Sequence, residues 1–382
     1  MIYLDNAATT RLNPEVLDAM MPYLTESFGN PGSLHALGRS ALAAVDHARE
    51  QVASFLGRDP SQIIFTSGGS EGNSLVVRGI LPELRRRGRA WLLVSAIEHE
   101  SLLNAAKASI KEEFYLSLVK PYYDGEIMPD AVRKAMQLDT GFVSVMTANN
   151  ETGVINDVNT IYGHCHSNGA LFHTDAVQAA GTEDLSAIRC DFMTISSHKI
   201  HGPKGVGALF AADPSMLSPL IYGGSEQEHG LRGGTENVAG IVGFGKACEL
   251  AAKHREETCG KLKSLRDTFL YALKQELAYG DVYVNGFCAP RTPKVLSLLF
   301  PGIDAQTLLL ALDSCGVCVS AGSACTAHES QPSHVLTAMQ LNEEEARSIV
   351  RVSFSTDNTG EEVTSAARIL ASNVKTLRDL RL

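Results

Sequence analysis

The chain has 382 residues, of which 44% are hydrophobic and 20% are charged, and its formal net charge is −10. The length predicts about two to three structural units, and the composition is that of a globular protein. The acidic balance argues against a generic surface for nucleic acid or anionic membranes. The first residues include neither a basic segment nor a long apolar run, so we expect no secretory signal. No apolar run in the sequence reaches a membrane-spanning length. We therefore expect a cytoplasmic protein with no direct nucleic-acid or membrane partner.

Eight cysteines are scattered along the chain, which favours reduced thiols in a cytoplasmic protein. Cys315 and Cys318 form a CxxC pair, but no second pair completes a zinc site and the segment is apolar. We expect these two thiols to be buried structural groups. His164, Cys165 and His166 lie on a predicted helix, where adjacent side chains point in different directions. The sequence therefore predicts no metal site.

Short β-rich runs alternate with helical patterns through the first two thirds of the chain. Residues 1–35 are rich in small polar and turn-forming residues, which predicts an irregular segment. Apolar spacings of three and four predict a helix over 42–55, and helical stretches follow at about 101, 129–138 and 157–167. The predicted strands cover 62–66, 91–95, 114–119, 142–146, 171–174, 192–195 and 206–210. This alternation predicts an α/β domain with a mostly parallel sheet covered on both faces.

The last third of the chain has a different character. A glycine-dense segment over 222–237 precedes a long predicted helix over 238–277. Predicted strands then cover 281–285, 295–300, 317–320 and 349–354, with helices near 304–313, 333–340 and 360–378. This pattern predicts a smaller α+β domain, with a boundary inside the long helix near 255–265.

Polar residues follow several predicted strands, at the sheet edge where ligands of α/β proteins gather. The loop 67–73 is glycine-rich and opens a helix, so it predicts an anion site, although a serine-capped helix start is the alternative. Asp175 and Lys199 end two further strands. Pyridoxal 5′-phosphate (PLP) requires a lysine that forms a Schiff base and a carboxylate that keeps the pyridine nitrogen protonated. Taken alone, the same pair is also compatible with a helix cap and a solvated lysine.

Cys325 lies in a run of small residues, Ser320-Ala321-Gly322-Ser323-Ala324-Cys325-Thr326. Small residues without apolar neighbours predict an exposed loop, where a cysteine does not serve as core filler. A thiol in such a loop becomes a nucleophile when nearby positive charge lowers its pKa.

An ordered set of motifs connects these features: YLDNAATT (3–10), FGNPGSLH (28–35), IIFTSGGSEGN (63–73), EHES (98–101), NNETGV (149–154), FHTDAVQ (172–178), SSHKIHGPKGVG (196–207), GLRGGTEN (230–237), SAGSACT (320–326) and RVSFS (351–355). In content and order the set resembles the cysteine desulfurases of the NifS/IscS type, class-V aminotransferases of PLP fold type I. The SAGSACT form is similar to the long-loop subgroup. The resemblance implies a large PLP-binding α/β domain over 15–260 and a small α+β domain formed by 1–14 and 261–382.

The resemblance also implies the residues that bind PLP. Lys199 holds the cofactor covalently, Asp175 pairs with its pyridine nitrogen, and the imidazole of His99 stacks on its ring. Two further residues, Gln178 and Asn150, are implied beside the phenolic oxygen. The implied phosphate ligands are the backbone of Gly69 and the side chains of Ser70, Ser196 and His198. Thr235 is implied to reach the PLP phosphate of the partner subunit, which makes the protein a homodimer.

The implied substrate is L-cysteine, whose carboxylate is gripped by Arg351, with Asn150 nearby. Lys199 and His99 move protons, and Cys325 attacks the substrate sulfur and keeps it as a persulfide while L-alanine leaves. The sulfur then passes to an acceptor protein of unknown identity in iron–sulfur cluster assembly, thiolation of tRNA or cofactors, or DNA phosphorothioation. Two alternatives remain: a PLP lyase or aminotransferase of the same fold that does not use Cys325, and a non-catalytic docking component of a sulfur-transfer complex.

Overall fold

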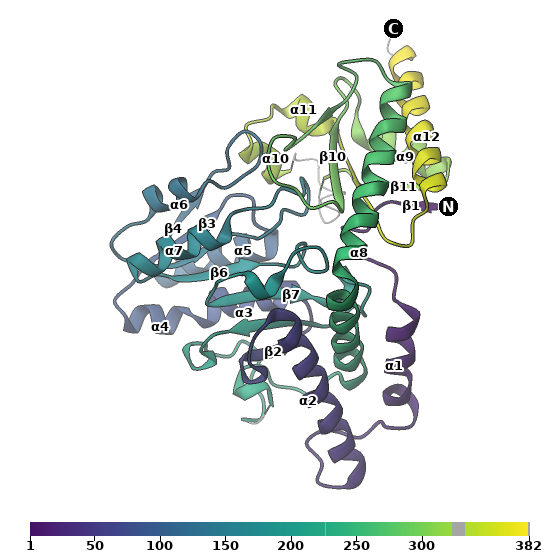
Figure 1. Cartoon of the computed structure of the whole chain (residues 1–382). Helices are drawn as coiled ribbons and strands as arrows, with labels where there is room; N and C mark the ends of the chain where they lie inside the picture. The colour runs from purple at the N-terminus through teal and green to yellow at the C-terminus, as the bar shows by residue number, and fades with distance from the viewer. Residues whose placement is uncertain (226, 323–332, 381–382) are drawn as a thin grey trace.

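The computed structural model describes residues 1–225, 227–322 and 333–380. A seven-stranded mixed sheet forms the centre of the larger part of the molecule (Figure 1). Its strand order is β2-β8-β7-β6-β5-β3-β4. In this sheet β8 runs in the direction opposite to the other six strands. The strands are β2 (Ile63–Thr66), β3 (Trp91–Ser95), β4 (Tyr115–Val119), β5 (Thr140–Ser144), β6 (Leu171–Asp175), β7 (Phe192–Ser196) and β8 (Gly207–Ala211). The predicted α/β class is therefore confirmed.

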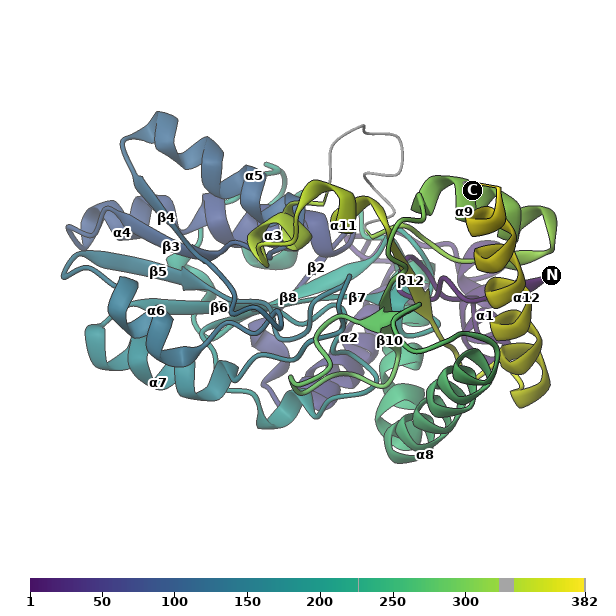
Figure 2. The ribbon, with the colours of Figure 1, turned by 90° about the horizontal axis from the view of Figure 1, so that it is seen from above.

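Helices cover both faces of this sheet (Figure 2). One face packs against α3 (Gly69–Gly79), α4 (Leu81–Arg86) and α5 (Glu100–Ser109). The other packs against α2 (Ala36–Leu56), α6 (Pro129–Ala135), α7 (Val158–Asn168) and the first half of α8 (Val238–Glu276). Leu92, Leu93 and Val94 of β3 are fully buried in succession, as expected for a strand covered on both faces. Each such side chain contributes about 1.5–3 kcal/mol by leaving water.

A second, smaller core lies at the C-terminal end of α8 (Figure 1). It contains a three-stranded antiparallel sheet, β12-β10-β9, and a two-stranded parallel pair, β1-β11. These strands are β1 (Ile2–Tyr3), β9 (Tyr283–Val284), β10 (Val295–Leu299), β11 (Val317–Cys318) and β12 (Ile349–Ser353). Its helices are α9 (Ala305–Ser314) and α12 (Gly360–Asp379), whereas α10 (His334–Ala338) and α11 (Glu343–Arg347) pack against the larger core. The first strand of the chain thus joins the C-terminal part, because β1 pairs with β11.

Two sequence predictions are wrong. Residues 1–35 are not irregular throughout, because α1 (Pro14–Thr25) lies within them. The Asn13 side chain accepts a hydrogen bond from the N–H of Glu15, and Pro14 occupies the first turn, where it is compatible with a helix. Cys315 is exposed and Cys318 is half-buried rather than buried, since Cys315 lies just after the end of α9.

The part of the chain that the structure describes contains no helix that is long and apolar enough to cross a membrane. Within those same residues, no group of three or more His, Cys, Asp or Glu side chains is placed to hold a metal ion.

Candidate active site

A cavity of about 240 Å³ lies at the carboxyl ends of the central strands and is closed on one side by the N-terminal segment. It collects most of the predicted site residues from motifs that are far apart in the sequence. The predicted residues that line it are Gly69, Ser70, His99, Asn150, Asp175, Gln178, Ser196, His198, Lys199 and Arg351. Thr235 does not line it, and Cys325 lies outside the described residues.

Asp175 is the last residue of β6 and is almost completely buried. Its Oδ2 accepts a hydrogen bond from Nδ2 of Asn73 at 2.7 Å, and its Oδ1 accepts one from the N–H of Val177 at 3.0 Å. Both partners fix the carboxylate without neutralising it, so it can pair with a positively charged ring nitrogen. Asn73 ends the glycine-rich motif after β2, but its residue type alone does not predict this contact.

Lys199 follows β7, and its amine is held by the N-terminal segment. Nζ donates to the carbonyl oxygens of Ala7 at 2.7 Å and Ala8 at 2.8 Å. The amide of Gln178 donates to the same carbonyl of Ala7 at 2.9 Å, while its buried Oε1 has no partner among the described residues. The backbone of the YLDNAATT motif (3–10) is therefore part of the site. Its role could not be predicted from residue types, because alanine side chains carry no polar group.

The N-terminus of α3 faces the same cavity. Gly68 precedes the helix with a φ of +148°, a conformation that favours glycine, and no side chain caps the first N–H groups. Ser70, Ser196 and His198 line the cavity with this helix end. Burial and the nearby Lys199 lower the pKa of His198 to about 4, so its imidazole is neutral at pH 7. Uncapped N–H groups and neutral polar side chains form a good anion site.

His99 lies at the N-cap of α5, and its Nδ1 accepts a hydrogen bond from the N–H of Ser101 at 3.1 Å. This bond assigns the proton of the neutral ring to Nε2. Burial lowers the pKa of His99 and favours that neutral form. The preceding residue, Glu98, is completely buried, and burial raises its pKa to about 8.

Arg351 is a buried cation on β12, with 2% of its surface exposed. Its Nη2 forms an ion pair with Asp5 at 2.8 Å, and its Nη1 donates to the backbone carbonyl of Asn150 at 3.0 Å. Its Nε has no partner among the described residues. Arg351 also pairs through its backbone with Ser320, which lies five residues before Cys325 in the sequence.

Thr235 is exposed in the segment that precedes α8. It lies outside the cavity of its own chain. The neighbouring Ile221 and Tyr222 are exposed apolar side chains, and Ile221 pairs with Arg232 through the backbone. The described chain therefore does not bring Thr235 to the other predicted residues.

The described residues fit PLP. Lys199 supplies an amine, Asp175 supplies an ionic partner for a ring nitrogen, and the uncapped end of α3 supplies donors for a phosphate. The buried Oε1 of Gln178 and the Nε of Arg351, both unpaired among the described residues, add hydrogen-bonding capacity toward a ligand.

Comparisons with known proteins agree with this geometry. Residues 2–365 match the family model described as "Aminotransferase class-V". "Cysteine desulfurase IscS" of Dictyoglomus turgidum is 38% identical over 99% of this chain and 96% of its own length. "Putative cysteine desulfurase IscS 1" of Bacillus subtilis is 41% identical over 98% of this chain and 99% of its own length.

Solved structures extend the likeness to three dimensions. A "NIFS-LIKE PROTEIN" superposes with a TM-score of 0.90 at 32% identity, over 98% of this chain and 100% of that one. "SspA in complex with cysteine" superposes with a TM-score of 0.82 at 32% identity, over 93% of this chain and 99% of that one. The chain therefore belongs to the class-V aminotransferases, and within them to the PLP-dependent cysteine desulfurases of the IscS/NifS type.

Proposed function

We propose that this enzyme converts L-cysteine to L-alanine and retains the sulfur as a persulfide on Cys325. The cysteine desulfurase relatives and the structural relative titled as a complex with cysteine support the substrate. The observation that carries the residue roles is the single cavity shared by Lys199, Asp175 and Arg351. PLP bound at Lys199 supplies an electron sink for the pair left at the substrate α-carbon.

Arg351 binds the substrate carboxylate. Its planar guanidinium offers several donors in fixed directions, and the unpaired Nε is free of competition within the described residues. Asp5 neutralises the buried charge before substrate arrives, and the carbonyl of Asn150 holds the side chain in place. Asn150 also lines the cavity, where its amide contacts the substrate or the phenolic oxygen of the cofactor.

Lys199 moves the proton at the substrate α-carbon, because it lines the cavity beside Asp175 and Gln178. His99 would face the cofactor ring as a neutral imidazole that carries its proton on Nε2. Asp175 would pair with the ring nitrogen, and Gln178 would contact the phenolic oxygen. The Gly69 N–H with Ser70, Ser196 and His198 would hold the phosphate.

Cys325 attacks the substrate sulfur as a thiolate. The bond between that sulfur and the β-carbon breaks, and its electron pair stays with the carbon. Protonation of the β-carbon and return of a proton to the α-carbon by Lys199 complete L-alanine. Gly322 and Ser333 are the described residues that come before and after the part of the chain that contains Cys325. Both lie close to Glu151, the residue that follows Asn150. Oγ of Ser333 donates to Oε2 of Glu151 at 2.6 Å, and a Cβ built on Gly322 would lie 3.2 Å from the same oxygen.

A homodimer is part of the proposal, with Thr235 reaching the PLP phosphate of the second subunit. Its support is that Thr235 is exposed next to Ile221 and Tyr222 and lies away from its own cavity. Replacing Thr235 with Ala should weaken PLP retention without changing the dimer mass measured by analytical ultracentrifugation. A monomer at micromolar concentration would contradict this part of the proposal.

We also propose that the protein belongs to the long-loop subgroup and is cytoplasmic. Its large domain is formed by residues 15–260, and its small domain is formed by 1–14 together with 261–382. Within α8, residues up to Ala251 pack in the larger core and residues from Leu262 onward pack in the smaller one, which supports a domain boundary in this helix. The sulfur acceptor is a protein of iron–sulfur cluster assembly, of tRNA or cofactor thiolation, or of DNA phosphorothioation. Capture of partners by the persulfide-loaded enzyme would distinguish these routes.

The decisive experiment compares Cys325→Ser with Cys288→Ser, a control substitution at a cysteine that is exposed in the structure. With L-cysteine and a reductant, Cys325→Ser should lose sulfide release while it keeps the absorbance of bound PLP. Cys288→Ser should keep both. Full sulfide release by Cys325→Ser would instead favour a lyase or aminotransferase that does not use this thiol, and full biological function of Lys199→Ala would favour a docking role.

A further inference from the structure

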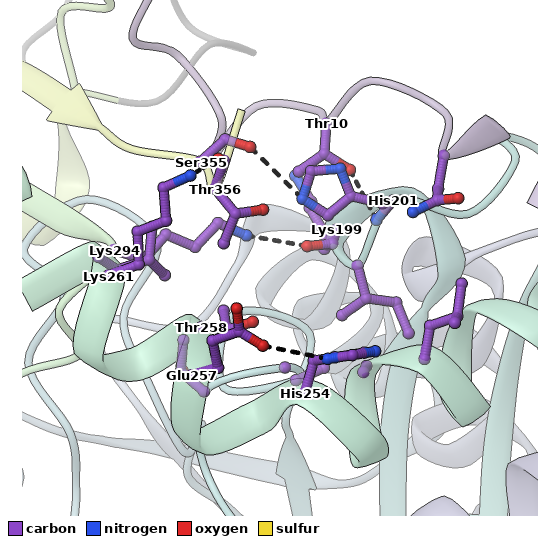
Figure 3. A pocket seen from close by; sticks show the side chains of 18 of the residues that line it. Thr10, Lys199, His201, His254, Glu257, Thr258, Lys261, Lys294, Ser355 and Thr356 are labelled. Carbon is purple, nitrogen blue, oxygen red and sulfur yellow. Dashed lines mark hydrogen bonds and ion pairs between the residues drawn. The ribbon is translucent and has the colours of Figure 1, made fainter. Parts of the chain in front are cut away.

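A second cavity, of about 310 Å³, lies behind Lys199, between α8, the N-terminal segment and the residues before β10 (Figure 3). We call it the junction cavity, and its defining residues are Thr10, His254, Glu257, Thr258, Lys261 and Lys294. The mechanism described above uses none of them. Lys199 borders both cavities, with its amine directed to Ala7 and Ala8 and its backbone carbonyl directed to Lys294.

Lys294 is the main charged group of the junction cavity, and only 5% of its surface is exposed. Its Nζ donates one hydrogen bond, to the carbonyl oxygen of Lys199 at 2.9 Å, as Figure 3 shows. The other two N–H bonds of the ammonium have no partner among the described residues. Burial lowers the pKa of Lys294 to about 7, and the charged groups that act on it, Lys199 and Arg351, are both cations. A buried ammonium normally has an anionic partner, and no described residue supplies one to Lys294.

Lys261, an exposed residue, adds a second cation to the lining, whereas burial lowers the pKa of His201 and leaves its imidazole neutral. Lys261 extends from α8 and donates to the carbonyl of Thr356 at 2.5 Å, and His201 lies near Ser355 on the opposite side (Figure 3). Glu257 is the one carboxylate among the lining residues, and it lies 3.2 Å from the imidazole of His254. Its side chain is 81% exposed, so it does not neutralise Lys294.

The lining also defines the kind of anion that fits. The hydroxyl of Thr258 lines the cavity and can donate to an oxygen atom of a ligand. The hydroxyl of Thr10 donates instead to the carbonyl of His198 at 3.0 Å, and that of Ser355 contacts Nε2 of His201 at 3.5 Å. Apolar side chains, among them Leu250 and Phe354, line the remaining wall. An inorganic oxyanion would leave this apolar part unused, whereas a carboxylate with a short hydrocarbon body would use both parts.

We propose that the junction cavity binds a small organic carboxylate, with the carboxylate on Lys294 and Lys261 and the hydrocarbon body against α8. The site is separate from the substrate site and does not depend on the roles assigned there. Because Lys294 also donates to the carbonyl of Lys199, an occupant would be connected through Lys294 to the backbone of the lysine that carries the cofactor.

The test is isothermal titration calorimetry on the PLP-loaded enzyme with hexanoate, its neutral analogue hexanamide, and inorganic phosphate. We expect saturable binding of hexanoate, and binding at least tenfold weaker for hexanamide and phosphate. Lys294→Met should weaken hexanoate binding at least tenfold, and Lys253→Met, an exposed control on the same helix, should leave it unchanged. Thr258→Met keeps the lysines and should block binding by filling the cavity, so the result does not depend on how Lys294→Met folds.

Arg351→Lys separates the two cavities. Hexanoate binding that survives Lys294→Met but is lost in Arg351→Lys would place the ligand in the substrate site and overturn the proposal. Equal binding of hexanamide, binding of phosphate alone, or no saturable binding of hexanoate would overturn it as well. None of these outcomes bears on the role of Cys325, because sulfide release is not the readout.

Discussion

Glu98 should make the stability of this enzyme fall as the pH rises through neutrality. The side chain is completely buried, with Oε1 accepting hydrogen bonds from Ser95 Oγ at 2.5 Å and from the N–H of Met146 at 2.6 Å. Oε2 has no partner among the described residues. Burial, with the nearby charge of Asp175, raises the pKa of Glu98 to about 8, so the folded protein keeps a proton that the unfolded chain releases.

The sign and size of the effect follow from proton linkage. Below the unfolded pKa, which is about 4.3, both states are protonated and the contribution of Glu98 to stability is fully present. Between that pH and about pH 8, the folded state binds more protons, so stability falls by about 1.4 kcal/mol per pH unit. The complete loss is about 5 kcal/mol, and no further loss from this group occurs above the folded pKa.

Glu98→Gln removes the titration and keeps an oxygen acceptor for Ser95 and Met146. At pH 5 the variant should be less stable by about 1–3 kcal/mol, because its amide N–H replaces the unpaired Oε2. Above pH 5 the parent loses about 1.4 kcal/mol of stability per pH unit through Glu98, whereas the variant does not. The variant should therefore be the more stable protein at pH 8.

Urea unfolding at pH 5, 6, 7 and 8, followed by the fluorescence of the single tryptophan, Trp91, measures this difference at fixed enzyme and PLP concentrations. Glu256→Gln, at an exposed position on α8, controls for the loss of one carboxylate. A difference between Glu98→Gln and the parent that stays constant with pH would show that Glu98 is ionised in the folded protein and refute the reasoning.

Three further predictions concern other contacts. Arg351→Lys should lower kcat/KM for L-cysteine by about 10- to 100-fold while the absorbance of bound PLP is unchanged, because it loses one charged hydrogen bond of about 1.5–3 kcal/mol. Arg49→Met should lower the free energy of urea unfolding by about 3–5 kcal/mol, because it removes the ion pair of 2.6 Å that Arg49 forms with the buried Glu228. Adding Glu228→Gln should recover part of this loss. Gly202→Ala should cost about 1–3 kcal/mol in thermal unfolding, because its Cβ would lie 2.0 Å from Ser197 Oγ; no comparable loss is expected for Gly163→Ala, which has open space.

The order of strands and helices could be predicted because it depends on local apolar periodicity. β3 covers Trp91–Ser95 as predicted, and the bounds of β6, β7 and α9 differ from the prediction by one residue. The helix α1 was missed because Pro14 and Pro22 resemble breakers in a sequence, whereas Pro14 lies in the first turn, where its missing N–H costs nothing.

The candidate site divides in the same way. The sequence by itself determined which residue types lie at the strand ends, and its motifs identified the family, because strand ends and glycine turns are local features. Only the tertiary structure decided which distant groups share a hydrogen bond: Ala7 with Lys199, Asn73 with Asp175, and Asp5 with Arg351. Local propensity carries no information about such pairs, because their partners meet only when the sheet, the N-terminal segment and the small C-terminal core pack together.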